Sequence, residues 1–198
     1  MAPNPELGSI ALLVLVVGSG CRAAAVSDLG TPAWYVDDGV HNGLLFRAED
    51  APFRPYQTDP SPDRRTVRFV EYGYAERSWV LGHGRTPFHL WAITRGTGEG
   101  VVVVRVFGTL EDAIEGRSVQ QVTLDGARVE RLGQFLEGWV SPEKERWIIV
   151  EQPVTYVLSS SRPYSTLKNN CRHFTAEALE AMQLDVQDLV TGAASSAR

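Results

Sequence analysis

The sequence predicts an α+β fold, in which a mixed, mostly antiparallel sheet packs against a C-terminal helix and one further helix. Three observations favour this class. Short runs rich in β-branched and aromatic residues recur between turn residues, two later segments repeat their apolar residues at helical spacing, and strands and helices do not alternate strictly. The chain has 198 residues, of which 43% are hydrophobic, which suits one packed domain.

Strands are expected at residues 34–36, 44–46, 66–72, 101–107, 118–124, 147–151 and 155–159. The run 101–107 (VVVVRVF) is the strongest of them, and its β-branched residues favour burial on both faces of the sheet. The glycine-tyrosine pair at 73–74 is expected to end the strand before it. Residues 48–65 contain four prolines and many charges, which predicts a loop. The segments 77–81 and 90–94 remain ambiguous.

Two helices are expected in the second half of the chain. Asp125 is expected to cap a helix that runs to about residue 140. Its apolar positions recur at helical spacing: Val129, Leu132, Leu136 and Trp139. The second helix is expected from about residue 170 to 182, after the N-cap candidates Asn169 and Asn170. Residues 110–115 predict only one or two helical turns.

Charge and motif content argue against several classes of partner. The net charge of −5 makes phosphate backbones and anionic membrane surfaces unfavourable, so no nucleic-acid partner is expected. The sequence has neither a GxGxxG nor a Walker loop, and no cofactor is expected. A metal site is a weak alternative, since the candidate ligands lack the close pairing of zinc motifs: His41, Glu71, His83, His89 and Cys171.

The N-terminal segment resembles an export signal. Residues 10–17 (IALLVLVV) form an apolar run too short to span a bilayer, and small residues lead to Cys21, a candidate for lipidation. Ala23-Ala24-Ala25 offers an alternative cleavage site, and a start codon upstream of the true one would make the segment a plain tail. We expect a signal at 1–25, a linker at 26–33, a domain at 34–190, a tail at 191–198, and export to the periplasm or cell envelope.

Cys171 is the candidate nucleophile. It falls in the first turn of the expected C-terminal helix, where unpaired N–H groups and the helix dipole favour a thiolate. The same N–H groups can donate to an oxyanion on an attacked carbonyl. By its position alone, however, Cys171 is more often a buried structural cysteine than a catalytic one.

His41, at the start of an early strand, is the candidate base. His173 is two residues from Cys171, and side chains at that helical spacing point to different sides. Glu71 is the best candidate to orient the imidazole, because it interrupts an apolar strand where an unpaired carboxylate is unfavourable. Glu76 is a weaker candidate, and an exposed edge-strand glutamate is the ordinary alternative for Glu71.

Three segments together resemble a known family. Residues 169–179 (NNCRHFTAEAL) resemble the asparagine-cysteine motif that opens the nucleophile helix in the circularly permuted branch of the NlpC-like, papain-like superfamily, which includes the lecithin retinol acyltransferase relatives. HNGLLF at 41–46 and VEYGYAERSW at 70–79 precede it, as in a similar family of uncharacterised bacterial proteins. The acyltransferase relatives carry a second histidine soon after the first; this chain has none there, so Glu71 would take the orienting role.

The resemblance implies a permuted papain-like fold and a cysteine hydrolase of an amide or ester bond, acting through an acyl-enzyme. Cys171, His41 and Glu71 are the implied catalytic residues, and Asn170, Tyr164 and Tyr74 are candidates for substrate or oxyanion binding. The expected substrate is a small molecule, peptide or lipid, with possible membrane anchoring through Cys21. The alternative is a non-catalytic, envelope-associated binding domain that retains the fold.

Overall fold

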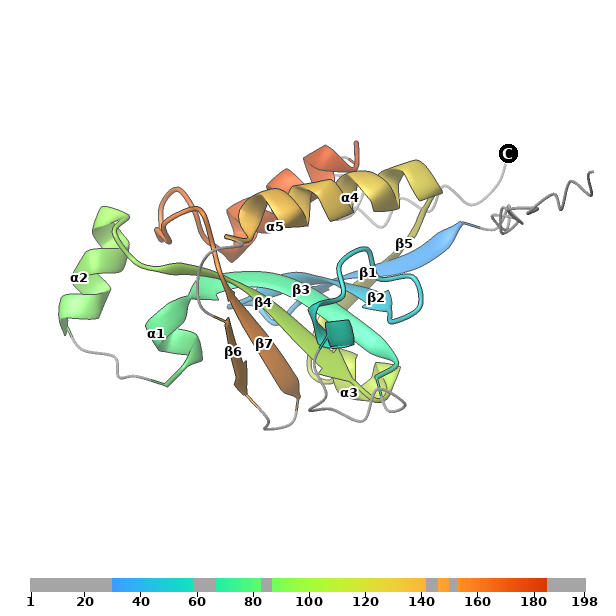
Figure 1. Ribbon diagram of the computed structural model, residues 1–198, viewed down its shortest axis with the longest axis horizontal. Coiled ribbons are helices and arrows are strands. Elements are labelled where there is room, and N and C mark those ends of the chain that lie inside the picture. The colour runs from blue at the N-terminus through green and yellow to red at the C-terminus, as the bar shows by residue number, and fades with distance from the viewer. Residues whose placement is uncertain (1–29, 59–66, 83–86, 142–145, 150–152, 185–198) are drawn as a thin grey trace, which may run out of the picture.

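The computed structural model describes residues 30–58, 67–82, 87–141, 146–149 and 153–184. They form an α+β fold around one antiparallel sheet with the strand order β5-β1-β2-β3-β4-β7-β6 (Figure 1). The strands are β1 (Thr31–Asp37), β2 (Asn42–Arg47), β3 (Phe69–Glu76), β4 (Gly100–Phe107), β5 (Ser118–Leu124), β6 (Arg146–Ile149) and β7 (Val154–Ser159). The expected α+β class is therefore confirmed. The sequence predicts a mixed, mostly antiparallel sheet, and every pairing between the described strands is antiparallel.

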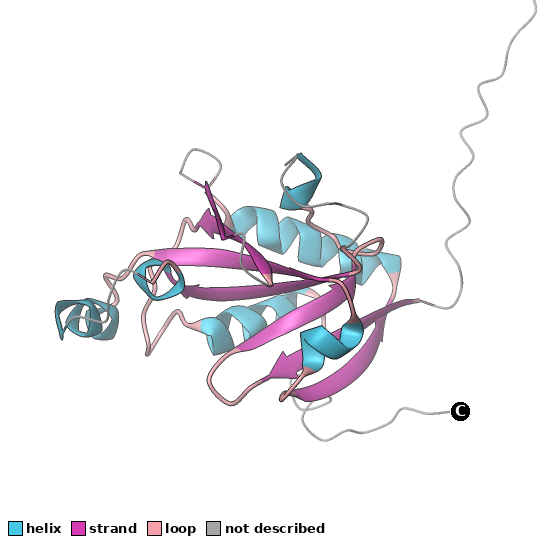
Figure 2. Ribbon diagram, turned by 90° about the horizontal axis from the view of Figure 1, so that it is seen from below, coloured by secondary structure: helices cyan, strands magenta, loops and turns pink. Residues whose placement is uncertain are grey.

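The helices are η1 (Pro55–Thr58), α1 (Arg77–Val80), α2 (Pro87–Arg95), α3 (Leu110–Ile114), α4 (Gly126–Trp139) and α5 (Cys171–Ala181). The long helices α4 and α5 run along one face of the sheet (Figures 1 and 2). Their apolar residues, including Leu132, Leu136 and Phe174, join the main core with alternate residues of β2, β3 and β4. The short helix α3 packs beside the opposite face, where Trp34 and Leu45 form a smaller core.

Both predicted N-caps of the long helices are present. The Asp125 carboxylate accepts a hydrogen bond from the Arg128 N–H at 2.8 Å, and Asn170 caps α5 in the same way. These caps satisfy backbone N–H groups that have no partner within the helix. Strand β4 is buried on both faces, as its β-branched run predicts.

The predicted end of the third strand at residues 73–74 is wrong. Strand β3 continues to Glu76 because its register with β4 persists, with Gly73 opposite Val103 and Tyr74 opposite Val102. The ambiguous segments 77–81 and 90–94 correspond to helices α1 and α2. Strand β1 begins at Thr31, before the apolar stretch that predicted it and within the expected linker.

The expected signal segment, Cys21 and the C-terminal tail lie outside the described residues. Within the described part of the chain, no helix has the length and apolar character needed to cross a membrane.

Candidate active site

A tight turn between β1 and β2 delivers His41. The carboxylate of Asp37 accepts from the N–H of Gly39 at 2.7 Å, and that of Asp38 accepts from the N–H of Val40 at 2.9 Å. Asp38 also accepts from the His41 N–H at 2.6 Å. Gly39 has a φ of 84°, a conformation that favours glycine. These bonds fix the backbone just before β2 and so hold the imidazole at the start of that strand.

Cys171 is the first residue of α5. The Asn170 side-chain oxygen accepts from the N–H groups of Arg172 at 3.0 Å and His173 at 3.1 Å. Its amide nitrogen donates to the Thr166 carbonyl at 2.7 Å. Asn170 is therefore the helix cap. Its side chain bonds the N–H groups of Arg172 and His173, and the Cys171 N–H is not part of these capping bonds. The His173 ring lies beside the same cap, with Nδ1 2.9 Å from the Asn170 oxygen, so His173 is committed to its own helix end.

A buried polar bridge joins helix α5, which begins with Cys171, to strand β2, which follows His41. Thr175 on α5 donates to the Asn42 side-chain oxygen at 3.1 Å, and the Asn42 amide donates to the Tyr35 hydroxyl at 3.1 Å. Asn42 and Thr175 are both buried. The Cys171 thiol donates to the Val40 carbonyl at 3.7 Å, one residue before His41. The helix start is thereby held against the residue that precedes the imidazole.

Glu71 lies behind His41 and is almost fully buried, with 1% of its side chain exposed. One carboxylate oxygen is 3.8 Å from His41 Nε2 and 3.2 Å from Arg105 Nη1, and the other is 2.7 Å from Arg117 Nη1. Two guanidinium groups thus satisfy the carboxylate, which is why it is tolerated inside the fold. Among the described residues His41 Nε2 has no hydrogen-bond partner, so Glu71 acts on it through its charge.

The surroundings of His41 favour the neutral imidazole. Burial is the main cause that lowers the pKa of His41 below its ordinary value of 6.5, and the Arg105 guanidinium adds to it. Glu71 and Asp38 oppose this shift. A carboxylate opposite Nε2 favours the tautomer with its proton on Nε2, which leaves the Nδ1 lone pair to accept a proton. The site therefore presents a base that is unprotonated at neutral pH.

Cys171 and His41 line one cavity of about 580 Å³. Its other walls come from β3, β4, β6, β7, α1, α2 and the segment before α5. Such a volume lies in the range of small-molecule sites. The described part of the chain contains no group of three or more His, Cys, Asp or Glu side chains placed to hold a metal ion.

The two candidate tyrosines behave differently. Burial, followed by the charges of Cys171 and Glu76, raises the pKa of Tyr164 to about 12, so its hydroxyl is protonated at neutral pH and can donate. Burial also raises the pKa of Tyr74 to about 12, but the Tyr74 hydroxyl already donates to the Arg162 carbonyl at 2.7 Å. Tyr164 is therefore the better oxyanion candidate, while Tyr74 contributes its ring to the cavity wall.

The remaining sequence candidates lie elsewhere. Glu76 caps α1 by accepting from the Trp79 N–H at 3.0 Å, so it is not the partner of His41. His83 lies outside the described residues, as does the side chain of His89. Arg105 and Arg117 are additions from the structure. Arg105 is the arginine of VVVVRVF, and like Glu71 it is a charged residue inside an apolar strand, which indicates a partner. The strand register places Arg105 directly opposite Glu71. Arg117 stands before β5 and gave no such signal.

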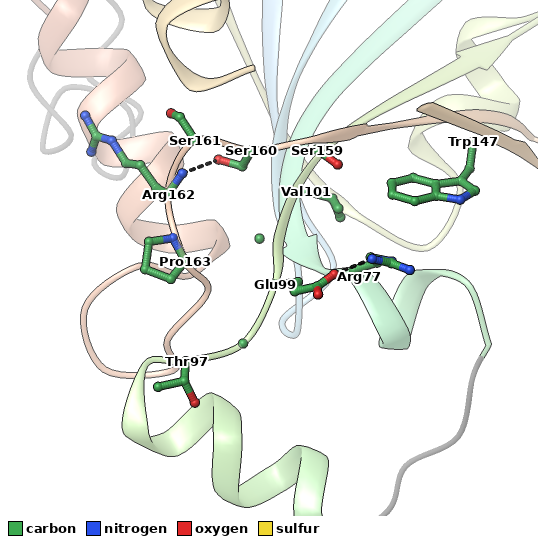
Figure 3. A pocket seen from close by; sticks show the side chains of 12 residues that line it. Arg77, Thr97, Glu99, Val101, Trp147, Ser159, Ser160, Ser161, Arg162 and Pro163 are labelled. Atoms are coloured by element: carbon green, nitrogen blue, oxygen red, sulfur yellow. Dashed lines mark hydrogen bonds and ion pairs between the residues drawn. The ribbon is translucent and has the colours of Figure 1, made fainter. Parts of the chain in front are cut away.

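A second hollow of about 600 Å³ lies beside Arg77, Trp147 and residues 159–163 (Figure 3). Its lining includes Ser159, Ser160 and Ser161 but no histidine or cysteine. The Ser160 hydroxyl accepts from the Arg162 N–H at 3.0 Å, and Arg77 pairs with Glu99. Size therefore does not distinguish the two hollows, but only the cavity at Cys171 pairs a nucleophile with a base among the described lining residues.

Gly73 makes room for the imidazole, which gives a testable prediction. A Cβ at Gly73 would stand 2.6 Å from His41 Nε2, closer than real side chains permit. Gly73→Ala is therefore expected to displace the ring and to destabilise the fold by about 1–3 kcal/mol, the usual cost of overpacking. In the His41→Ala background the clash is gone, so the same change should cost little. Urea unfolding of the four proteins measures this coupling; equal costs in both backgrounds would contradict the described packing.

Comparison of the chain with protein-family models, with curated proteins and with solved structures gave no match in any of the three.

Proposed function

We propose that this protein is a cysteine-dependent hydrolase of amide or ester bonds, built on a circularly permuted papain-like fold. The observation that carries the proposal is the shared cavity of Cys171 and His41, with Glu71 behind the imidazole. The nucleophile comes from the last described helix and the base from the first hairpin, the chain order of the permuted branch. The three motifs of the sequence thus meet at one place in the fold.

The proposed reaction follows from the positions of these groups. His41 takes the thiol proton through Nδ1, and the Cys171 sulfur attacks the substrate carbonyl carbon. The Cys171 N–H and the Tyr164 hydroxyl donate to the oxyanion that forms. The intermediate collapses to a thioester, the bond to the leaving group breaks, and His41 returns its proton to that group. Water, deprotonated by His41, then attacks the thioester carbon. The C–S bond breaks, the acid leaves, and the Cys171 sulfur regains the proton from His41.

Glu71, Arg105 and Arg117 act as positioning residues in this scheme. The carboxylate stabilises the imidazolium that forms during the reaction, and it fixes the tautomer of the resting state. The two arginines keep that carboxylate in place by direct contact. Arg105 also keeps the resting imidazole neutral, because its charge lowers the pKa of His41.

The pH dependence of hydrolysis tests the proposal. Because the pKa of His41 is lowered, the base stays neutral below pH 6.5, and the acidic limb of kcat/KM for p-nitrophenyl acetate is expected below that pH. Arg105→Met removes a cation that lowers this pKa, so the limb should move to higher pH. Glu71→Gln removes an anion that raises it, so the limb should move to lower pH.

Stopped-flow or plate-reader rates from pH 4 to 9 measure both shifts in folded protein, with folding checked by circular dichroism at each pH. Arg128→Met, in an exposed ion pair on α4, serves as the matched control and should leave the limb unchanged. If the acidic limb lies at the same pH in Arg105→Met, Glu71→Gln and the wild type, His41 is not the base, and the proposal is contradicted.

A further inference from the structure

The cavity at Cys171 is chemically divided. On the sheet side it is lined by Ala75, Val103 and Ile149, and on the helix side by Val80, Leu90 and Ile93. Cys171, His41 and Tyr164 supply the reactive groups. The apolar part of the lining is thus contributed both by strands of the sheet and by the two short helices.

Four polar residues of the lining are already engaged within the fold: Tyr74, Glu76, Arg105 and Thr155. Tyr74 donates to the Arg162 carbonyl, and the Thr155 hydroxyl donates to the Pro153 carbonyl at 2.9 Å. Glu76 caps α1, and Arg105 pairs with Glu71. A polar substrate group placed between the sheet and α2 would therefore lose water without finding these side chains as new partners, which is unfavourable.

The mouth of the cavity exposes large apolar side chains. Trp79 is 50% exposed, Leu90 48% and Val40 82%, and all three line the cavity. They come from three separate elements, which are α1, α2 and the β1–β2 turn. Apolar surface that surrounds an opening and stays in contact with water gains free energy when an apolar ligand covers it.

We propose that the cavity binds the acyl part of the substrate and that this part is an apolar chain longer than an acetyl group. This inference rests on the proposed function. The ester or amide carbonyl lies at Cys171, the acyl chain runs between the sheet and helices α1 and α2, and the leaving group remains toward solvent. The Cys171 sulfur bonds to the acyl carbon, the bond to the alcohol or amine breaks, and His41 supplies its proton.

The test is the chain-length dependence of hydrolysis. Rates are measured for p-nitrophenyl acetate, butyrate, hexanoate and octanoate, each below its micelle concentration, with the Cys171→Ala rate subtracted. We expect kcat/KM to rise about fourfold for each buried methylene, which corresponds to about 0.8 kcal/mol. A flat or falling series, with acetate hydrolysed well, overturns the inference and leaves the proposed function standing.

Leu90→Asp locates the effect. This change at the mouth should flatten the chain-length series, because it should lower kcat/KM for octanoate far more than kcat/KM for acetate. Val119→Asp is the matched control, since Val119 is similarly exposed, at 39%, but lies on the edge strand β5 away from the cavity. Equal effects of the two variants would show that the chain binds elsewhere and would overturn the inference.

If the protein hydrolyses none of the esters, the proposed function is overturned. A binding assay then tests separately whether the cavity binds an apolar ligand. Decanoate should displace 8-anilinonaphthalene-1-sulfonate from the wild type and from Val119→Asp, and at least tenfold more weakly from Leu90→Asp. This result would support an apolar ligand site in a protein that does not hydrolyse esters. Absence of displacement from the wild type overturns the apolar site as well.

Discussion

Replacing Cys171 with alanine is expected to lower kcat/KM for an activated ester by at least about 10³-fold, because the acyl-enzyme has no other atom on which to form. Intact-mass measurement after a brief exposure to p-nitrophenyl acetate should show one added acetyl group in the wild type and none in the variant. Iodoacetamide at neutral pH should likewise label Cys171 in the folded wild type. Because Cys21 is a second thiol of the chain, labelling is read by peptide mapping, and Cys171→Ala should carry no label beyond that on Cys21.

Folding is expected to survive this substitution. The thiol makes one weak hydrogen bond, to the Val40 carbonyl at 3.7 Å, and alanine removes only the sulfur atom from this buried position, so the free energy of unfolding should change by about 1 kcal/mol. Cys171→Ser is the companion variant, because it keeps a donor of similar size with a far weaker nucleophile. Unchanged turnover in Cys171→Ala, or a thiol that reacts only after denaturation, would refute the proposed role of this cysteine.

Glu71→Gln is expected to lower the free energy of unfolding by about 3 kcal/mol. The neutral amide leaves two guanidinium groups without their shared counter-charge in a site where Glu71 is 1% exposed. Breaking a buried ion pair from one side costs about 3–5 kcal/mol, and the lower end applies here because both arginines retain some contact with water. For a domain of this size the melting temperature should fall by roughly 6–12 °C.

The chain supplies a closely matched control for this experiment. Arg162 and Glu177 form an ion pair at 2.7 Å, the same separation as Arg117 and Glu71, but both side chains are well exposed. Glu177→Gln should therefore cost less than about 1 kcal/mol. Urea unfolding with matched slopes measures both variants. If the two variants destabilise the protein equally, the Glu71 carboxylate does not form a buried ion pair with Arg105 and Arg117.

The helices and their caps could be predicted from local sequence because their determinants are local. Asp125 and Asn170 are recognisable as caps from residue type and from the apolar spacing that follows. Glu71 could be singled out because a carboxylate inside an apolar strand requires a partner. None of these inferences needed knowledge of which strands pair.

Other features depend on the tertiary arrangement and could not be predicted from the sequence. The extension of β3 past Gly73 is fixed by its pairing with β4, which outweighs the usual effect of glycine in a strand. Arg117 reaches Glu71 from 46 positions away, and nothing in its local sequence marks it. Part of the cavity wall likewise comes from α1 and α2, the two segments that the sequence left ambiguous. Helix α1 packs against β3 and β7, and a helix of this length depends on such contacts for its stability.

The contact between the Cys171 thiol and the Val40 carbonyl joins residues 131 positions apart in the chain. Nearly all of the described domain lies between them, so this closure can form only when the intervening strands have been ordered and stacked. In the proposed reaction the thiol would therefore act only in the completed domain, and a chain interrupted during folding is expected to be inactive.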